Sequence, residues 1–259
     1  KPEFILSNAS IEKFNEYIEK IEISNTNYID SFFDPKNYER QKEISEFLFF
    51  KTFEVIDKNT GEVKTVTKSG KEAEQISQET LIDFCREIRI ISSITHPSIL
   101  KFLGYSQVNF KDKPKPMLLC EGCPQGSLRN ILRSKEKVTN LNDTKKLIIL
   151  YGIASAMSFL HSNDIIHRNI KPEIIYLDKS FYPKLSGFLI SRENAVKQPP
   201  KESKLKGTPK YSAPEIFVNL EYSKSSDIYS FALVMYEIMT NQIPFEKVQA
   251  IDCLHEVLC

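Results

Sequence analysis

The residues best suited to chemistry lie between His167 and Leu177, in the stretch HRNIKPEIIYL. Arg168 carries a permanent positive charge that could receive a phosphate group. Asn169 can hydrogen-bond a hydroxyl group, but its amide cannot take the proton of that hydroxyl. The stretch therefore offers positive charge and hydrogen bonding, and no general base at Asn169.

The elements that must position this stretch change in type along the chain. Residues from Phe47 to Ile56 and from Glu62 to Lys68 are rich in β-forming side chains, and the turn DKNTG separates them. The segment from Gly70 to about Ile94 predicts a charged linker followed by an amphipathic helix. Leu147 to His161 predicts a long apolar helix. We therefore expect strands in the first part of the chain and helices in the second.

Another amphipathic helix is predicted near the start of the sequence, with Ser10 as its N-cap. Its apolar residues recur at spacings of three and four: Ile11, Phe14, Ile18 and Ile21. We expect this helix to dock on the body of the same chain. The alternative is one half of a partner-binding helix pair, and a stripe this short does not distinguish the two.

Composition and charge exclude several classes of protein. The chain has 259 residues, of which 41% are hydrophobic, and a formal net charge of +1. These values suit one large domain or two lobes, and they predict binding neither to nucleic acid nor to a membrane surface. The sequence shows neither a secretory start nor an apolar run that could span a bilayer.

The cysteines show no disulfide-framework spacing, and they are Cys85, Cys120, Cys123, Cys253 and Cys259. Their odd number predicts reduced thiols in a cytoplasmic protein. The pair Cys120-x-x-Cys123 is half of a redox or zinc motif, but it has no second cysteine pair and no histidine pair at ligand spacing. We therefore expect no metal and no cofactor.

Several motifs, in the right order, resemble those of protein kinases. HRNIKPEIIYL resembles the catalytic loop H-R-D-L-x-x-x-x-N, and GTPKYSAPE from Gly207 resembles the end of an activation segment. The wording SSDIYSF resembles the tyrosine-kinase-like group, whereas Lys171 is typical of serine/threonine kinases. The resemblance covers about Asn37 to Cys259, most of the chain.

The resemblance implies an α+β, bilobal protein-kinase-like fold with a small β-rich N-lobe and a helical C-lobe. It divides the chain into an N-terminal extension over residues 1–36, an N-lobe over 37–121 and a C-lobe over 122–259. The sequence stops near where the next helix of the family begins. We therefore expect a C-lobe truncated before its last helices.

The positions that carry chemistry in the family hold other residues here. The catalytic Asp falls on Asn169, the two magnesium ligands fall on Ile174 and Gly187, and the third-strand lysine falls on Thr67. Lys68 follows Thr67, so it should point to the opposite face of its strand unless a bulge intervenes. The glycines of the phosphate-binding loop fall on Ser45, Phe47 and Phe50.

The positions that hold the kinase fold together are retained. Glu87 matches the ion-pair glutamate of the family's C-helix, and Ile91 its apolar neighbour one turn on. His167 and Phe188 fit the apolar column inside the fold, and Asp227 fits the group that holds the backbone at His167. Glu215 ends the Ala-Pro-Glu motif. The resemblance gives these residues structural roles with or without catalysis.

We interpret this pattern as a pseudokinase, a catalytically inactive domain that is not an enzyme. Loss of a general base alone costs about 10²–10⁴ in rate, and magnesium needs oxygen ligands. We expect a protein-binding scaffold or signalling switch, with weak or absent ATP binding. The alternatives are a structural component of a larger assembly, and a weak, unorthodox Ser/Thr kinase or ATP binder that uses Lys68, Glu87 and Lys171.

The segment from Gly187 to Glu215 could contribute to a switch. It contains Ser191, Ser203 and Thr208, which are candidate phosphorylation sites that could pair with Arg168. It is also basic, through Lys197, Lys201, Lys204, Lys206 and Lys210. An acidic protein partner would suit this charge, although a solvated loop is the default interpretation.

Overall fold

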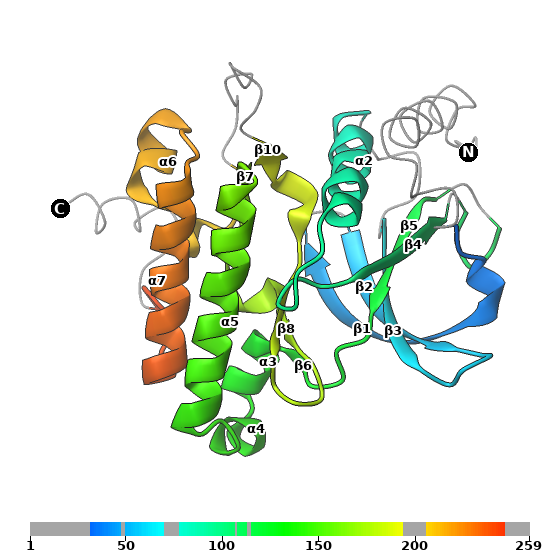
Figure 1. The fold of residues 1–259 in the computed structure, drawn as a ribbon, viewed down its shortest axis with the longest axis horizontal. Coiled ribbons are helices and arrows are strands. Elements are labelled where there is room, and N and C mark those ends of the chain that lie inside the picture. The colour runs from blue at the N-terminus through cyan, green and yellow to red at the C-terminus, as the bar shows by residue number, and fades with distance from the viewer. Residues whose placement is uncertain are drawn as a thin grey trace, which may run out of the picture. The chain divides into compact units, whose positions relative to one another are not determined.

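The computed structural model describes residues 32–47, 50–69, 78–106, 108–112, 115–193 and 206–246. Figure 1 shows the path of the chain. The helix predicted at Ile11–Ile21, Ser203, and the lysines at 197, 201 and 204 lie outside these residues. The chain divides into two compact units: one holds residues up to Thr95 together with Leu100–Pro124, and the other holds His96–Ile99 together with the residues from Gln125 onward. We describe each unit by itself.

The first unit is built on an antiparallel sheet in the order β1-β2-β3-β5-β4. After the short 3-10 helix η1 (Pro35–Asn37), its strands are β1 (Tyr38–Phe47), β2 (Phe50–Asp57), β3 (Val63–Ser69), β4 (Phe102–Ser106) and β5 (Met117–Glu121). The predicted turn joins β2 to β3: Gly61 takes a φ of 71°, and its N–H donates to the carbonyl of Asp57 over 2.8 Å. Glycine is favoured there because other residues are strained at positive φ.

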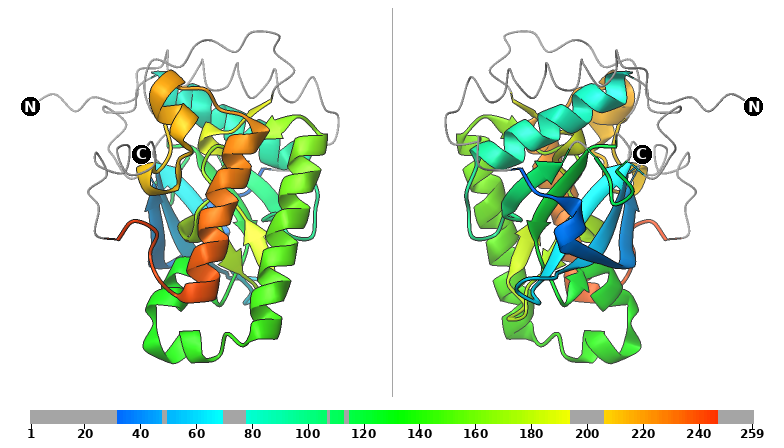
Figure 2. Two further views of the ribbon diagram at one scale, coloured as in Figure 1. Left: turned by 90° about the vertical axis from the view of Figure 1, so that its left-hand side faces the viewer. Right: turned by 90° about the vertical axis from the view of Figure 1, so that its right-hand side faces the viewer.

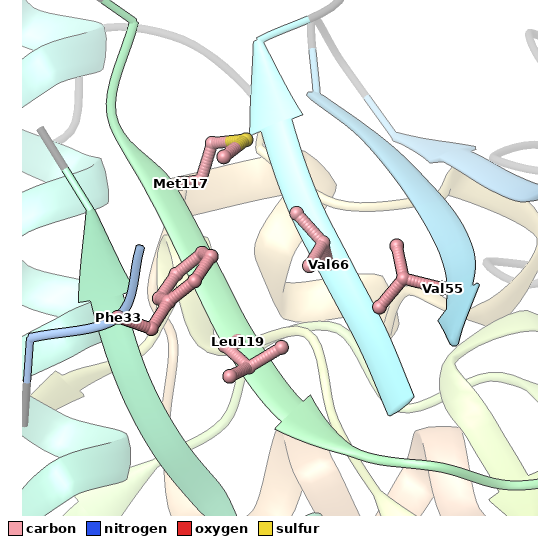
Figure 3. Packing of buried hydrophobic residues seen from close by; sticks show 5 residues of the cluster. All are labelled: Phe33, Val55, Val66, Met117 and Leu119. Carbon is pink, nitrogen blue, oxygen red and sulfur yellow. The ribbon is translucent and has the colours of Figure 1, made fainter. Parts of the chain in front are cut away.

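Alternation along the strands gives this sheet two different faces. On one face Phe33 packs with side chains of β2, β3 and β5, namely Val55, Val66, Met117 and Leu119 (Figure 3). On the other face the ring of Phe50 stacks on Phe84 of the helix α2 (Gln78–Ser93), with the ring centroids 4.9 Å apart. The apolar residues of β2 therefore serve a core on each side of the sheet.

The second unit is mainly helical. Its helices are α3 (Leu128–Arg133), α4 (Lys135–Thr139), α5 (Asp143–Ser162), α6 (Pro214–Asn219) and α7 (Lys224–Thr240). Short strands make two small sheets: β6 (Gly126–Ser127) with β8 (Ile175–Leu177) and β9 (Pro183–Leu185), and β7 (Ile165–Ile166) with β10 (Arg192–Glu193). Single turns of 3-10 helix occur at η3 (Pro172–Ile174), η4 (Phe188–Ile190) and η5 (Pro209–Tyr211).

Polar caps fix the ends of the two long helices, which lie side by side (Figures 1 and 2). The Asn142 side chain accepts a hydrogen bond from the N–H of Lys145 at the start of α5. Ser223 and Ser226 bond each other's backbone N–H at the start of α7, which makes a capping box. α7 stops where Asn241 takes a left-handed φ of 56°. These caps account for helix boundaries that apolar periodicity alone leaves open.

The structure confirms the α+β fold and corrects two predicted boundaries. The β-rich run from Phe47 to Ile56 is not one strand, because Phe47 ends β1 and Phe50 begins β2. The long helix begins at Asp143, four residues before the predicted Leu147. Within the described residues, no helix is both long and apolar enough to cross a membrane.

Candidate active site

The loop between β7 and β8 holds the stretch with which the sequence analysis began. Asp227 of α7 is buried, and its two carboxylate oxygens hold the backbone of the loop. Oδ2 accepts the backbone N–H of His167 over 2.8 Å, and Oδ1 accepts that of Arg168 over 2.8 Å. The ring of His161 also lies 2.9 Å from Oδ2. Hydrogen bonds to a carboxylate are strong, so this loop is held in one conformation.

His167 links the loop to the segment that contains Gly187. Its Nε2 lies 2.9 Å from the carbonyl oxygen of Ser186, and its ring centroid lies 4.8 Å from that of Phe188. Burial lowers the pKa of His167, so the ring is neutral near pH 7. Since a carbonyl only accepts, Nε2 carries the proton and Nδ1 accepts the N–H of Asn169 over 3.3 Å. His167 and Phe188 are thus brought together as the resemblance implies.

A hydroxyl group is held between Asn169 and Lys171. The Lys171 ammonium donates to Oγ1 of Thr208 over 2.7 Å, and that hydroxyl donates to Oδ1 of Asn169 over 3.4 Å. Lys171 and Asn169 are both buried. Burial lowers the pKa of Lys171, because the charged form loses hydration. Thr208 comes from a segment almost 40 residues later in the chain, so the fold assembles this group of three.

Arg168 takes a left-handed backbone conformation with a φ of 70°. Its guanidinium centre lies 3.7 Å from the ring centroid of Tyr222, a cation–π contact. Ser191, a candidate phosphorylation site, is completely buried, and its hydroxyl donates to the carbonyl of His167 over 2.9 Å. Ser191 therefore acts in this structure as a support for the loop.

The two positions expected to correspond to magnesium ligands face each other. Gly187 has a φ of 79°, and a Cβ added to it would lie 3.0 Å from Cγ2 of Ile174. The N–H and hydroxyl of Ser186 both donate to the carbonyl of Ile174, over 3.0 and 2.8 Å. Neither Ile174 nor Gly187 has a side-chain oxygen. The donor set required by magnesium is therefore not met at these two positions.

Thr67 and Lys68 lie on opposite faces of β3, as strand alternation predicts. Thr67 faces the side of Phe50, where its hydroxyl lies 2.9 Å from that of Thr52. The Lys68 ammonium lies on the other face, 5.1 Å from the ring centroid of Phe53. The β2–β3 pairing is regular over its described length. Burial lowers the pKa of Lys68, and neighbouring cations lower it further.

The remaining predicted site positions of the first unit lie on the β1–β2 hairpin and on α2. Ser45 pairs with Thr52, and Phe47 pairs with Phe50, so these positions flank the tip of the hairpin. Phe50 is buried against α2. Glu87 and Ile91 of α2 are both buried. The Glu87 charge helps raise the pKa of Cys120, although burial is the larger cause.

Reasoning from the sequence missed one polar network in the second unit. Glu237 of α7 is almost completely buried and accepts hydrogen bonds from Arg133 of α3 and from the hydroxyl of Tyr211, the latter over 2.6 Å. Glu215, which the resemblance singled out, lies half-buried in the first turn of α6. The signal in the sequence was the acidic character of Glu237 within an otherwise apolar segment of α7.

The family described as protein tyrosine and serine/threonine kinase matches residues 43–258. The chain belongs to the protein kinase family. This kinase domain is 30% identical to a probable serine/threonine-protein kinase of Dictyostelium discoideum, over 73% of the chain and 14% of that protein. It is 32% identical to an Aurora kinase of Yarrowia lipolytica, over 82% of the chain and 54% of that protein.

An L-type lectin-domain containing receptor kinase of Arabidopsis thaliana is 30% identical, over 82% of the chain and 29% of that protein. The kinase domain therefore spans little more than half of the Aurora kinase and much less of the other two relatives. These comparisons correct one expectation. The interpretation of the chain as a protein that is not an enzyme is wrong, because its relatives are named as protein kinases. The scaffold and assembly roles stay predictions.

Proposed function

We propose that this kinase domain transfers a phosphoryl group from ATP to serine or threonine hydroxyls, at a low rate. The observation that carries the proposal is the group of three in the catalytic loop. Lys171 and Asn169 already hold a hydroxyl, that of Thr208, at hydrogen-bonding distances of 2.7 and 3.4 Å. Phosphoryl transfer depends mostly on positioning and on neutralising charge. The loop supplies both functions with Asn169 and Lys171.

The proposed step balances without a protein base. The substrate oxygen forms a bond to the γ-phosphorus of ATP while the bond from that phosphorus to the bridging oxygen breaks, and ADP leaves with the bonding electrons. Since the Asn169 amide cannot take the hydroxyl proton, the proton passes to an oxygen of the transferred group. The missing base lowers the rate by about 10²–10⁴ relative to a kinase that has one.

Two sequence features support the serine/threonine class and the group. Lys171 is typical of serine/threonine kinases, and the names of the relatives agree with it. The sequence DIYSF of α7, from Asp227 to Phe231, favours the tyrosine-kinase-like group. We infer that group from the wording alone.

The test is transfer of label from γ-labelled ATP to serine- and threonine-containing peptides. We expect slow incorporation by the unmodified chain and at least a tenfold loss in Lys171→Ala, since the charge beside the acceptor hydroxyl is removed. Lys68→Ala is the matched control, because burial lowers the pKa of Lys68 as well, but this lysine lies in the first unit, beside the ring of Phe53. Its label transfer should be unchanged.

Two results would contradict the proposal. One is incorporation by the unmodified chain that does not exceed that of Lys171→Ala. The other is an equal loss in the Lys68 and Lys171 variants, which would point to general destabilisation. Melting temperatures of both variants, measured in parallel, identify a loss of folding.

A further inference from the structure

The part of the catalytic loop that faces η4 is closed by hydrocarbon. Ile174 ends η3, Gly187 precedes η4, and a Cβ at Gly187 would lie 3.0 Å from Cγ2 and 3.2 Å from Cβ of Ile174. Ile174 is itself buried. The two backbones are also tied directly, because Ser186 donates two hydrogen bonds to the carbonyl of Ile174. The gap between these positions therefore cannot accept a longer side chain without movement.

Three of the oxygen atoms around this contact are already bonded within the protein. The carbonyl of Ser186 accepts a hydrogen bond from His167, and the hydroxyl of Ser186 donates one to the carbonyl of Ile174. Oδ1 of Asn169 accepts one from the hydroxyl of Thr208. Across the described residues, no group of three His, Cys, Asp or Glu side chains could hold a metal ion. Magnesium requires near-octahedral oxygen ligands and gives up its water reluctantly. The residues present do not fit the cation that kinases use.

The positive charge near the acceptor hydroxyl comes from the protein instead. Lys171 Nζ lies 2.7 Å from Thr208 Oγ1, in a buried position where its charge is weakly screened. An ammonium group is a compact point charge suited to phosphate. A free triphosphate carries more negative charge than its magnesium complex, so a buried cation attracts the free form more strongly.

We propose that this domain binds the triphosphate of its nucleotide as the free anion, without a divalent cation. The proposal rests on the proposed function for the identity of the ligand, but it concerns the metal dependence of binding. It assigns Ile174 and Gly187 a specific role: together they exclude the hydrated cation from the position next to the loop. The charge that a cation would neutralise is left to Lys171.

Isothermal titration of ATP into the unmodified chain tests the proposal, once with millimolar Mg²⁺ and once with EDTA. We expect a Kd in EDTA equal to or lower than the Kd in Mg²⁺. A Kd at least tenfold lower in Mg²⁺ would overturn the proposal, and so would absence of binding in both conditions. A surface lysine variant in α4, Lys137→Ala, serves as the control for lysine charge lost elsewhere in this unit.

Two variants test the role of the hydrocarbon contact. The double variant Ile174→Asn, Gly187→Asp restores oxygen ligands and should make ATP binding at least tenfold tighter in Mg²⁺ than in EDTA. Gly187→Asp alone should not, because its Cβ would still meet Cγ2 of Ile174. Thermal melting checks that each variant folds. An equal gain in the single and double variants would contradict the assigned role of Ile174.

Label transfer separates this inference from the proposed function. Binding that requires Mg²⁺, accompanied by label transfer, overturns the inference and leaves the function intact. Metal-independent binding without label transfer supports the inference and contradicts the proposed function. No binding and no transfer in any condition contradicts both proposals.

Discussion

Asn169 is the residue at which the chemistry of this loop can be changed with the smallest alteration in shape. In the described part of the chain its Nδ2 group has no hydrogen-bond partner, whereas Oδ1 accepts from Thr208. Replacement of the amide by a carboxylate therefore breaks no hydrogen bond of the side chain and adds an acceptor for the hydroxyl proton. The lysine beside it stabilises the added charge.

We predict that Asn169→Asp raises the rate of label transfer about 10²-fold or more, because a general base contributes 10²–10⁴. The rate should also gain an acidic limb in its pH profile, as the new carboxylate must be ionised to accept a proton. Asn140→Asp, at an exposed helix end, is the control and should leave both properties unchanged. An unaltered rate and profile for Asn169→Asp would show that Asn169 does not face the acceptor hydroxyl.

Residue-level roles were predictable where a local rule applied, and not where they depend on distant partners. The position of Lys68 on the face of β3 opposite to Thr67 follows from alternation along the strand. The network of Glu237 joins α7 to Arg133 of α3 and to Tyr211 of η5, residues separated by 104 and 26 positions. No spacing rule connects such residues, so the network required the structure.

At the scale of elements, periodicity identified the helices and strands better than their ends. The run from Phe47 to Ile56 is rich in β-forming residues, so its composition did not mark the hairpin between Phe47 and Phe50. Only the match of Ser45, Phe47 and Phe50 to the family's glycine positions placed a turn there. β1 also has irregular pairing between Arg40 and Ser45, which disrupts alternation. The residues that close such turns in kinases are glycines, and their replacement by phenylalanine removed the usual signal.

The contact between α5 and β9 gives a prediction in which two effects have opposite signs. Gly152 lies inside α5, where alanine is favoured by about 1 kcal/mol through helix propensity. However, an added Cβ would lie 2.4 Å from Cγ of Pro183 and 2.9 Å from the hydroxyl of Ser98. Overpacking costs about 1–3 kcal/mol or more, and the proline ring is rigid. The packing effect should therefore exceed the propensity effect.

We predict that Gly152→Ala lowers the free energy of unfolding by about 1–2 kcal/mol, measured by urea denaturation. The neighbouring Tyr151 is exposed, so Tyr151→Ala should change it by less than about 0.5 kcal/mol. A Gly152→Ala chain that is as stable as the unmodified one would mean that β9 moves freely away from α5. For this helix, the sequence indicated its existence and its apolar character, but neither its start nor its close approach to β9.

At the scale of the whole molecule, each unit contains thiol or tyrosine hydroxyl groups whose pKa is raised by folding, so that they stay protonated in alkali. In the first unit burial raises the pKa of Cys85 from 9.0 to about 12, and it raises the pKa of Cys120 as well. In the second unit burial raises the pKa of Tyr211, and its hydrogen bond to Glu237 adds to the effect. Lys68 and Lys171 have lowered pKa values and act in the opposite direction.

The sign of each contribution follows from proton binding. Above the ordinary pKa of a thiol, the unfolded chain has lost a proton that the folded chain still holds, so the free energy of unfolding falls as pH rises. For a lysine with a lowered pKa the unfolded chain holds the extra proton, and that free energy rises with pH up to the ordinary pKa of 10.5. The thiols and Tyr211 therefore destabilise the molecule in alkali, and the two lysines partly offset them.

One of these contributions can be measured at Cys85, because burial raises the pKa of this thiol from 9.0 to about 12. Between about pH 8 and about pH 10, its titration in the unfolded chain should remove about 1.4 kcal/mol from the free energy of unfolding. We predict that Cys85→Ala abolishes that part of the pH dependence, whatever its effect on stability at neutral pH. Ile88→Val, in the same buried part of α2, removes a methyl group without removing a thiol and should keep the full pH dependence. Urea denaturation of the three chains at both pH values measures the difference, and an identical loss of stability in all three would place the titrating groups elsewhere.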